Sequence, residues 1–320
     1  MESPGATRRR RARPSRTRFL LCVALAAVAV VGGTAAGTVY VKAQAHSGAA
    51  PVSSATATAT ASASAAADGE GSVESVTQQA VNRDALLAAA MKAVPVEDGA
   101  DVSVAVLDPD SGEGASYGTG SFDTASIVKV DILATLLLQA QDAGRQLTAS
   151  EKSYATAMIE NSDNDSASAL WRVIGQADGL DAANKRFGLT GTDGGDGMLW
   201  GLTQTTAADQ LALLRQVFGD DSQLSAASRT YQQGLMGRIA ADQHWGVSAA
   251  ADGSRWALKN GWLARSTTGL WDINSIGRVT VDGRDCLVAV LSNGNSTKAK
   301  GISLVEAVAK AAVSAVTEET

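Results

Sequence analysis

The feature that most restricts the fold is a stretch that is apolar in almost every direction, SIVKVDILATLLLQA at Ser126–Ala140. As a helix it would have no polar face to meet water, so it belongs in the middle of a folded unit. Other elements must surround it, which requires a chain long enough to build a substantial core. Lys129 lies inside this stretch, and burial of an ammonium group needs a compensating reason.

The N-terminal region predicts export. Seven arginines between residues 8 and 18 precede Phe19–Val41, a run without charged residues that is long enough to span a bilayer. Arginines before an apolar segment stay on the cytoplasmic side, which places the rest of the chain outside the cytoplasm. Ala43-Gln44-Ala45 resembles a cleavage site, whereas the length of the apolar run favours a retained membrane anchor. Residues 1–45 are therefore a basic N-terminus followed by a signal peptide or a signal anchor.

The next segment, residues 46–72, consists almost entirely of Ala, Ser, Thr and Gly, a composition typical of a disordered stalk. Residues 73–320 then form the predicted folded domain. Since the chain as a whole carries a net charge of −6 despite its basic start, this domain is acidic, and we expect no nucleic-acid partner. His244 is the sole histidine of the domain and Cys286 its sole cysteine, which argues against zinc ligation and a disulfide framework.

The pattern of the domain predicts two strands, a block of helices, three strands and a closing helix. Asp101–Asp108 and Gly114–Gly118 flank a turn and indicate a hairpin, and Thr148-Ala149-Ser150-Glu151 fits a capping box. The remaining predicted elements are helices near 72–94, 126–140, 151–160, 165–174, 178–187, 205–218, 223–239 and 300–316, and strands near 255–263, 269–281 and 284–292. This order indicates an antiparallel sheet with an inserted all-helical lobe.

Ser126 and Lys129 form the first candidate element of a site. A serine at a helix N-terminus lies in a positive field, and a lysine three residues later lies on the same face of the helix. In apolar surroundings the lysine becomes accessible as a neutral amine, which can act as a base. The ordinary interpretation is a capping serine and a lysine that reaches solvent.

Two further elements follow along the chain. Ser162-Asp163-Asn164 lies between two predicted helices, where such residues commonly serve only as turns and caps. Lys259-Asn260-Gly261 begins the first late strand, where a lysine can simply be solvated. Each element alone is a weak signal. The order S-x-x-K, S-D-N, K-x-G in an exported chain with this layout is strong.

With these motifs the chain resembles the penicillin-recognising serine hydrolases, in particular the class A β-lactamase group, over about residues 73–318. The resemblance implies an α+β fold of the β-lactamase/transpeptidase type, a five-stranded antiparallel sheet flanked by helices with an inserted all-helical lobe. It also implies roles for the motif residues. Ser126 would be the acylated nucleophile, Lys129 its base and Ser162 the proton donor to the leaving nitrogen. Asn164 would hold both the substrate amide and the Lys129 side chain. The substrate carboxylate would be bound by Lys259 and Asn260, beside Gly261. The oxyanion hole would consist of the N–H groups of Ser126 and Trp262.

Three departures from the family pattern are visible. Asn260 stands where the family usually has threonine, and the spacing from Ser126 to Ser162 is short, which predicts a more open cleft. No glutamate occurs between Glu160 and Glu306, so the family's deacylating glutamate is missing from residues 190–203, TGTDGGDGMLWGLT. Asp193 and Asp196 are the acids available there. We expect them to form turns rather than to activate water or bind calcium.

We therefore expect an extracytoplasmic active-site-serine hydrolase that forms an acyl-enzyme with a β-lactam or a peptidoglycan-like amide and deacylates it weakly. The alternatives are a D,D-peptidase of the penicillin-binding type and a non-catalytic cell-wall-binding or sensor module. We expect no metal and no cofactor, a monomer, and membrane contact through residues 19–41 if they are not cleaved. We expect four other residues to serve in packing, namely His244, Trp200, Trp271 and Cys286. We expect Trp262 to line the cleft, and Arg265 or Arg278 to help bind a carboxylate.

Overall fold

The computed structural model describes residues 81–318. The N-terminal predictions, namely the export segment at 19–41 and the stalk at 46–72, lie outside these residues, and the domain bounds stay predictions. Among the residues described, no helix has the length and apolar character needed to cross a membrane.

A five-stranded antiparallel sheet forms the centre of the fold, in the order β2-β1-β7-β6-β5. The strands are β1 (Asp101–Leu107), β2 (Gly114–Tyr117), β5 (Trp256–Ala264), β6 (Trp271–Val281) and β7 (Arg284–Asn295). The predicted hairpin is confirmed, with Val104 paired to Tyr117 and Leu107 to Gly114. The predicted fold class, an antiparallel α+β sheet with an inserted helical lobe, is confirmed as well.

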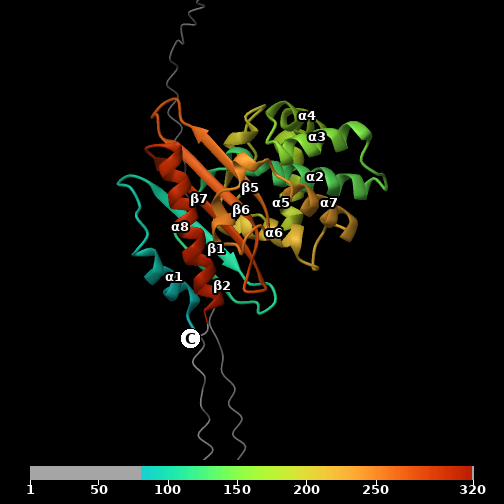
Figure 1. The fold of residues 1–320 in the computed structure, drawn as a ribbon. Coiled ribbons are helices and arrows are strands. Elements are labelled where there is room, and N and C mark those ends of the chain that lie inside the picture. Colours follow the sequence, from blue (N-terminus) through green and yellow to red (C-terminus); the bar gives the residue numbers. More distant parts are fainter. Residues whose placement is uncertain (1–80, 319–320) are drawn as a thin grey trace, which may run out of the picture. The chain divides into compact units, whose positions relative to one another are not determined.

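Helices cover both faces of the sheet. One face is covered by α1 (Arg83–Met91) and α8 (Lys298–Thr317), as Figure 1 shows. Against the other face packs α6 (Ala207–Phe218), which contacts β1, β6 and β7. Each face has its own buried apolar cluster, because alternate residues of every strand point to opposite sides.

The helical lobe surrounds the apolar stretch that the sequence places at the centre. The stretch forms α2 (Val128–Asp142), in which every residue from Val128 to Leu138 is buried. Around it and beside it lie α3 (Ala149–Glu160), α4 (Asn164–Ile174), α5 (Gln176–Phe187) and α7 (Ala226–Met236). The capping box of α3 is confirmed, since Thr148 and Glu151 exchange both hydrogen bonds.

Several short elements were not predicted. They are β3 (Phe122–Asp123), paired with β4 (Gln204–Thr205), and four 3-10 turns: η1 (Ala125–Ile127), η2 (Trp200–Leu202), η3 (Ala241–Gln243) and η4 (Gly246–Ala250). Pieces this short carry no periodic signal, and they form because neighbouring elements supply their partners. Three of them, η1, η2 and η3, contribute to the candidate site.

Candidate active site

Ser126 lies in a strained turn rather than at the start of a regular helix. It belongs to η1, and the residue before it, Ala125, has a positive φ of 47°, which is unfavourable for a residue with a side chain. The amide of Asn274 on β6 supports this turn by donating to the carbonyl of Asp123 (2.9 Å) and to that of Thr124 (3.1 Å). The sheet therefore stabilises the unfavourable backbone conformation of this turn.

Gly261 lets β5 approach this turn closely. A Cβ added at this position would lie 2.9 Å from the Ser126 nitrogen and 2.7 Å from the Thr124 carbonyl oxygen, both of them backbone atoms. The glycine of the K-x-G motif thus has a steric explanation. The same approach brings the Ser126 N–H beside the strand that carries Trp262, as an oxyanion hole would require.

We predict that Gly261→Ala misplaces the nucleophile. The new methyl must displace backbone, an overpacking effect of about 1–3 kcal/mol, and the acylation rate should fall with it. Urea unfolding and the acylation rate would measure the two effects. The matched control is Gly201→Ala, whose added Cβ would lie 3.9 Å from its nearest neighbour, the Ala125 Cα. Equal behaviour of the two variants would contradict the steric explanation.

Lys129 is fully buried in the first turn of α2 and is held by three acceptors. Its Nζ donates to the Ser162 carbonyl (2.7 Å), to Ser162 Oγ (3.1 Å) and to Asn164 Oδ1 (2.8 Å). Burial lowers the pKa of Lys129 to about 7, and the negative charge of Asp163 partly opposes this shift. Close to neutral pH the amine can therefore exchange a proton.

Lys259 reaches the same hydroxyl from the sheet. Its Nζ donates to Ser162 Oγ (3.0 Å), to the Asn260 carbonyl (3.0 Å) and to Gln243 Oε1 (3.5 Å). The side chain is fully buried, and burial together with the charge of Lys129 holds its pKa well below the usual value. Lys129 of the S-x-x-K motif and Lys259 of the K-x-G motif thus meet at Ser162 Oγ, whereas within residues 81–318 no hydrogen bond joins the Ser126 hydroxyl to these three side chains.

The S-D-N segment connects α3 to α4, and each of its three residues makes a different contact. Asp163 caps α4 by accepting from the Ser166 N–H (2.7 Å), which is the ordinary role of such a residue. Ser162 adopts a positive φ of 56° and directs its hydroxyl to both lysines. Asn164 accepts from Lys129 through Oδ1, which is one half of its predicted role. The capping and functional interpretations are therefore compatible.

The Asn260 side chain is engaged away from Ser162. Its Nδ2 donates to the carbonyls of Gln243 (2.8 Å) and Trp245 (3.0 Å), and its Oδ1 accepts from Ser275 Oγ (2.6 Å). Both N–H bonds of the amide are used, so none is left for a substrate carboxylate in this arrangement. Asn260 holds the η3–η4 segment against β5. Trp262, two residues on, is half-buried, and Lys298 Nζ lies 4.1 Å from its ring centroid.

The loop at 190–203, which lacks the family glutamate, contains two acids, Asp193 and Asp196. Within residues 81–318 their carboxylates make no hydrogen bond and no ion pair. Asp193 and Asp196 are exposed, and their hydrogen bonds are made by the backbone, Asp193 with Gln204 (3.0 Å both ways) and the Asp196 carbonyl with Leu199 (2.9 Å). Trp200 from this loop lies beside the site instead, with its ring centroid 5.0 Å from Lys129 Nζ. This contact has no signal in the sequence, because a tryptophan in a glycine-rich loop is equally compatible with core packing.

The remaining sequence candidates lie elsewhere or are already engaged. Arg265 pairs with Asp123 and with Asp272 (2.7 Å), and Arg278 pairs with Asp285 (3.3 Å) and lies over Phe218. His244 bonds the Ile239 carbonyl (3.0 Å) and packs edge-on against Trp256. Cys286 is buried, and burial raises the pKa of its thiol to about 11. Within residues 81–318 no cluster of His, Cys, Asp or Glu is arranged to hold a metal ion.

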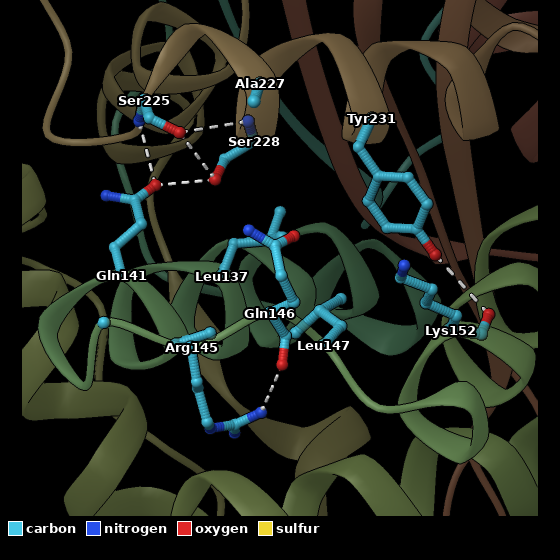
Figure 2. Close-up of a pocket in the computed structure, with 12 residues that line it drawn as sticks. Leu137, Gln141, Arg145, Gln146, Leu147, Lys152, Ser225, Ala227, Ser228 and Tyr231 are labelled. Atoms are coloured by element: carbon cyan, nitrogen blue, oxygen red, sulfur yellow. Dashed lines mark hydrogen bonds between the residues drawn. The ribbon is translucent and has the colours of Figure 1, made fainter.

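A separate pocket of about 500 Å³ lies at the opposite end of α2 (Figure 2). Leu137 and Leu147 contribute apolar lining, and Arg145, Lys152 and Tyr231 contribute polar groups. The Gln141 amide oxygen accepts from Ser225 and Ser228, which ties α2 to α7 beside it. None of the three motifs contributes a residue, so this pocket is distinct from the candidate active site.

Comparisons with known proteins identify the family of the chain and its fold. The family model described as "Beta-lactamase enzyme family" matches residues 138–316, which includes the S-D-N and K-x-G segments and begins after Lys129. No curated protein matches the chain.

Solved structures share the fold at low sequence identity. The TLA-1 extended-spectrum β-lactamase is 15% identical with a TM-score of 0.65, over 74% of this chain and 98% of that one. A class A β-lactamase from Bacteroides cellulosilyticus is 16% identical with a TM-score of 0.63, over 74% and 99%. A mutant of PBP-A in an acyl-enzyme complex with penicillin G is 20% identical with a TM-score of 0.60, over 71% and 94%. Identities this low establish the fold alone.

Proposed function

Because the chain belongs to the beta-lactamase enzyme family, we propose that it is an extracytoplasmic active-site-serine hydrolase that forms an acyl-enzyme on Ser126. Its substrates are β-lactams or peptidoglycan-like amides, and the acyl-enzyme deacylates slowly. The observation that carries the proposal is the meeting of Lys129 Nζ and Lys259 Nζ at Ser162 Oγ, at 3.1 and 3.0 Å. Export is supported by the arginine-rich start and the apolar run at 19–41.

Acylation begins with the neutral amine of Lys129. It accepts the proton of Ser126 Oγ while that oxygen attacks the substrate carbonyl carbon, and the N–H groups of Ser126 and Trp262 hold the resulting oxyanion. The pKa of about 7 makes the amine available near neutral pH, since a base works best when its pKa is close to the working pH.

Ser162 then carries the proton to the leaving nitrogen. Of the three acceptors around Lys129, the Ser162 carbonyl and Asn164 Oδ1 can only accept, whereas the hydroxyl of Ser162 can also donate. The lysine therefore passes its proton to Ser162 Oγ as that hydroxyl gives its own proton to the nitrogen. The C–N bond breaks, and the acyl group remains as an ester on Ser126.

Lys259 stabilises this relay and the negative end of the substrate. In its charged form Lys259 adds positive potential beside Ser162 Oγ, which favours loss of the hydroxyl proton. Asn260 acts as a positioning residue in this proposal, because its amide is committed to the Gln243 and Trp245 carbonyls.

Slow deacylation is supported by the loop at 190–203. Hydrolysis of the ester needs a base aimed at a water on the acyl carbon, and misplacement of such a group is costly. The loop offers exposed aspartates and an indole at the site, which favours a penicillin-binding enzyme over an efficient β-lactamase.

Intact-mass spectrometry with a β-lactam tests the proposal. We expect an adduct of the mass of the β-lactam within the mixing time, mapped to Ser126 and persisting, with burst kinetics and a slow steady state. Ser126→Ala should give no adduct. An adduct on Ser126→Ala would overturn the nucleophile assignment, and rapid turnover without an adduct would indicate a true β-lactamase. Absence of any adduct with β-lactams and peptidoglycan-like amides would favour a non-catalytic wall-binding module.

A further inference from the structure

The Trp200 side chain contacts Ser168 with its N–H edge and Lys129 with its ring face. The indole N–H donates to Ser168 Oγ on α4 (3.1 Å), while the ring centroid lies 5.0 Å from Lys129 Nζ. The side chain is half-buried and packs against the core of the helical lobe. An aromatic ring held at its edge and presented by its face to a lysine is oriented for a cation–π interaction.

The loop holds Trp200 in place without help from the lysine. The indole of Trp171 donates to the Gly197 carbonyl (2.6 Å), and the Gly195 N–H donates to Thr203 Oγ1 (3.1 Å). A Cβ at Gly195 would lie 2.2 Å from the Leu199 carbonyl oxygen, so the loop is closed tightly on itself. The position of the indole therefore follows from the loop fold.

The ring occupies a side of the amine that has no hydrogen bond. The three N–H bonds of the Lys129 ammonium go to Ser162 and Asn164. The charged groups that face it are Asp163 beside α4 and Lys259 on β5. On the side of η2 the amine meets an aromatic face, which attracts a cation.

We propose that Trp200 is a positioning residue of the acylation site, whose indole face steadies the Lys129 ammonium. This inference rests on the proposed role of Lys129 as the base. It gives the loop at 190–203 a function that needs no carboxylate. The attraction favours the charged form, so it opposes the effect of burial and raises the pH at which the amine loses its proton.

An NMR titration of the full chain with ¹³Cε-labelled lysine measures this directly, with the Lys129 signal assigned from Lys129→Met. In Trp200→Leu we expect the midpoint of Lys129 to fall by roughly 0.4 to 1.5 pH units, the equivalent of a typical cation–π attraction. Trp200→Phe keeps an aromatic face and should retain most of the wild-type midpoint. Trp256→Leu is the matched control, because that indole packs against His244 instead.

Two further measurements keep the test decisive. Ser168→Ala removes the acceptor of the Trp200 indole N–H without changing the ring, and we expect it to lower the Lys129 midpoint by a smaller amount. This variant replaces Trp200→Leu in the test if Trp200→Leu does not fold. The acid limb of the acylation rate against pH should move with the NMR midpoint. An unchanged or higher midpoint in both Trp200→Leu and Ser168→Ala would overturn the inference. Since the titration needs no substrate, a lack of acylation would refute the proposed function separately.

Discussion

Replacing Lys129 by methionine is expected to slow the acylation of Ser126 by about 10²–10⁴-fold, the usual loss when a general base is removed. Methionine approximates the length of the lysine stem but has no amine to accept the Ser126 proton. It also removes the donor that faces Ser162 Oγ and Asn164 Oδ1, so the relay to the leaving nitrogen is cut at its start. Stopped-flow acylation with a chromogenic β-lactam measures the rate.

The pH dependence of the wild type provides the second half of this prediction. The pKa of Lys129 is about 7, and the neutral form is the base, so the acylation rate should rise with pH through about 7 and level off above it. Lys129→Met should lose this rise. Lys152→Met, which removes an exposed lysine of α3, should keep both the rate and the profile. Acylation by Lys129→Met at the wild-type rate would mean that Lys129 is a structural lysine.

The central helix and the capping box of α3 were predictable because their signals are local. An apolar surface on every side of Val128–Leu138 demands burial, and the capping box of α3 depends on residues three positions apart. The convergence of Lys129, Ser162 and Lys259 followed from the resemblance to a family rather than from any one segment. The central helix and the capping box could therefore be predicted from short stretches of sequence, whereas the convergence needed the order of the motifs along the whole domain.

The parts that could not be predicted depend on partners distant in the chain. The strained turn at Ala125 requires the close approach of Gly261 and the amide of Asn274. The amide of Asn260 is used by carbonyls of η3 and η4, two elements without a periodic pattern. The contact of Trp200 with Lys129 depends on how a glycine-rich loop closes. Composition and periodicity contain none of this information, because tertiary contacts decide it.

Asp131→Asn is expected to stabilise the protein strongly at neutral and alkaline pH. Asp131 lies in the middle of α2 and is fully buried, and within the described residues neither carboxylate oxygen has a well-formed hydrogen bond. Burial raises its pKa from 3.8 to about 7, helped by the negative charges of Asp181 on α5 and Asp209 on α6. Nearby Asn184 and Thr135 oppose the shift without cancelling it.

The sign of the effect follows from which state holds the proton. Between about pH 4 and pH 7 the folded protein keeps Asp131 protonated while the unfolded chain has released the proton, so the free energy of unfolding falls as pH rises. Above pH 7 the folded state carries a buried charge, and the loss levels off at up to roughly 4 kcal/mol for a shift of about three pH units. Asparagine has nearly the same shape and never ionises, so it removes this loss.

Urea unfolding at pH 4 and pH 8 should show similar stabilities of the two proteins at pH 4 and a clearly higher stability of Asp131→Asn at pH 8. The exposed Asp98→Asn is the control and should follow the wild type at both pH values. An equal effect of Asp131→Asn at the two pH values would show that the carboxyl is not held protonated, and that Asn184 and Thr135 satisfy an ionised Asp131 in the core.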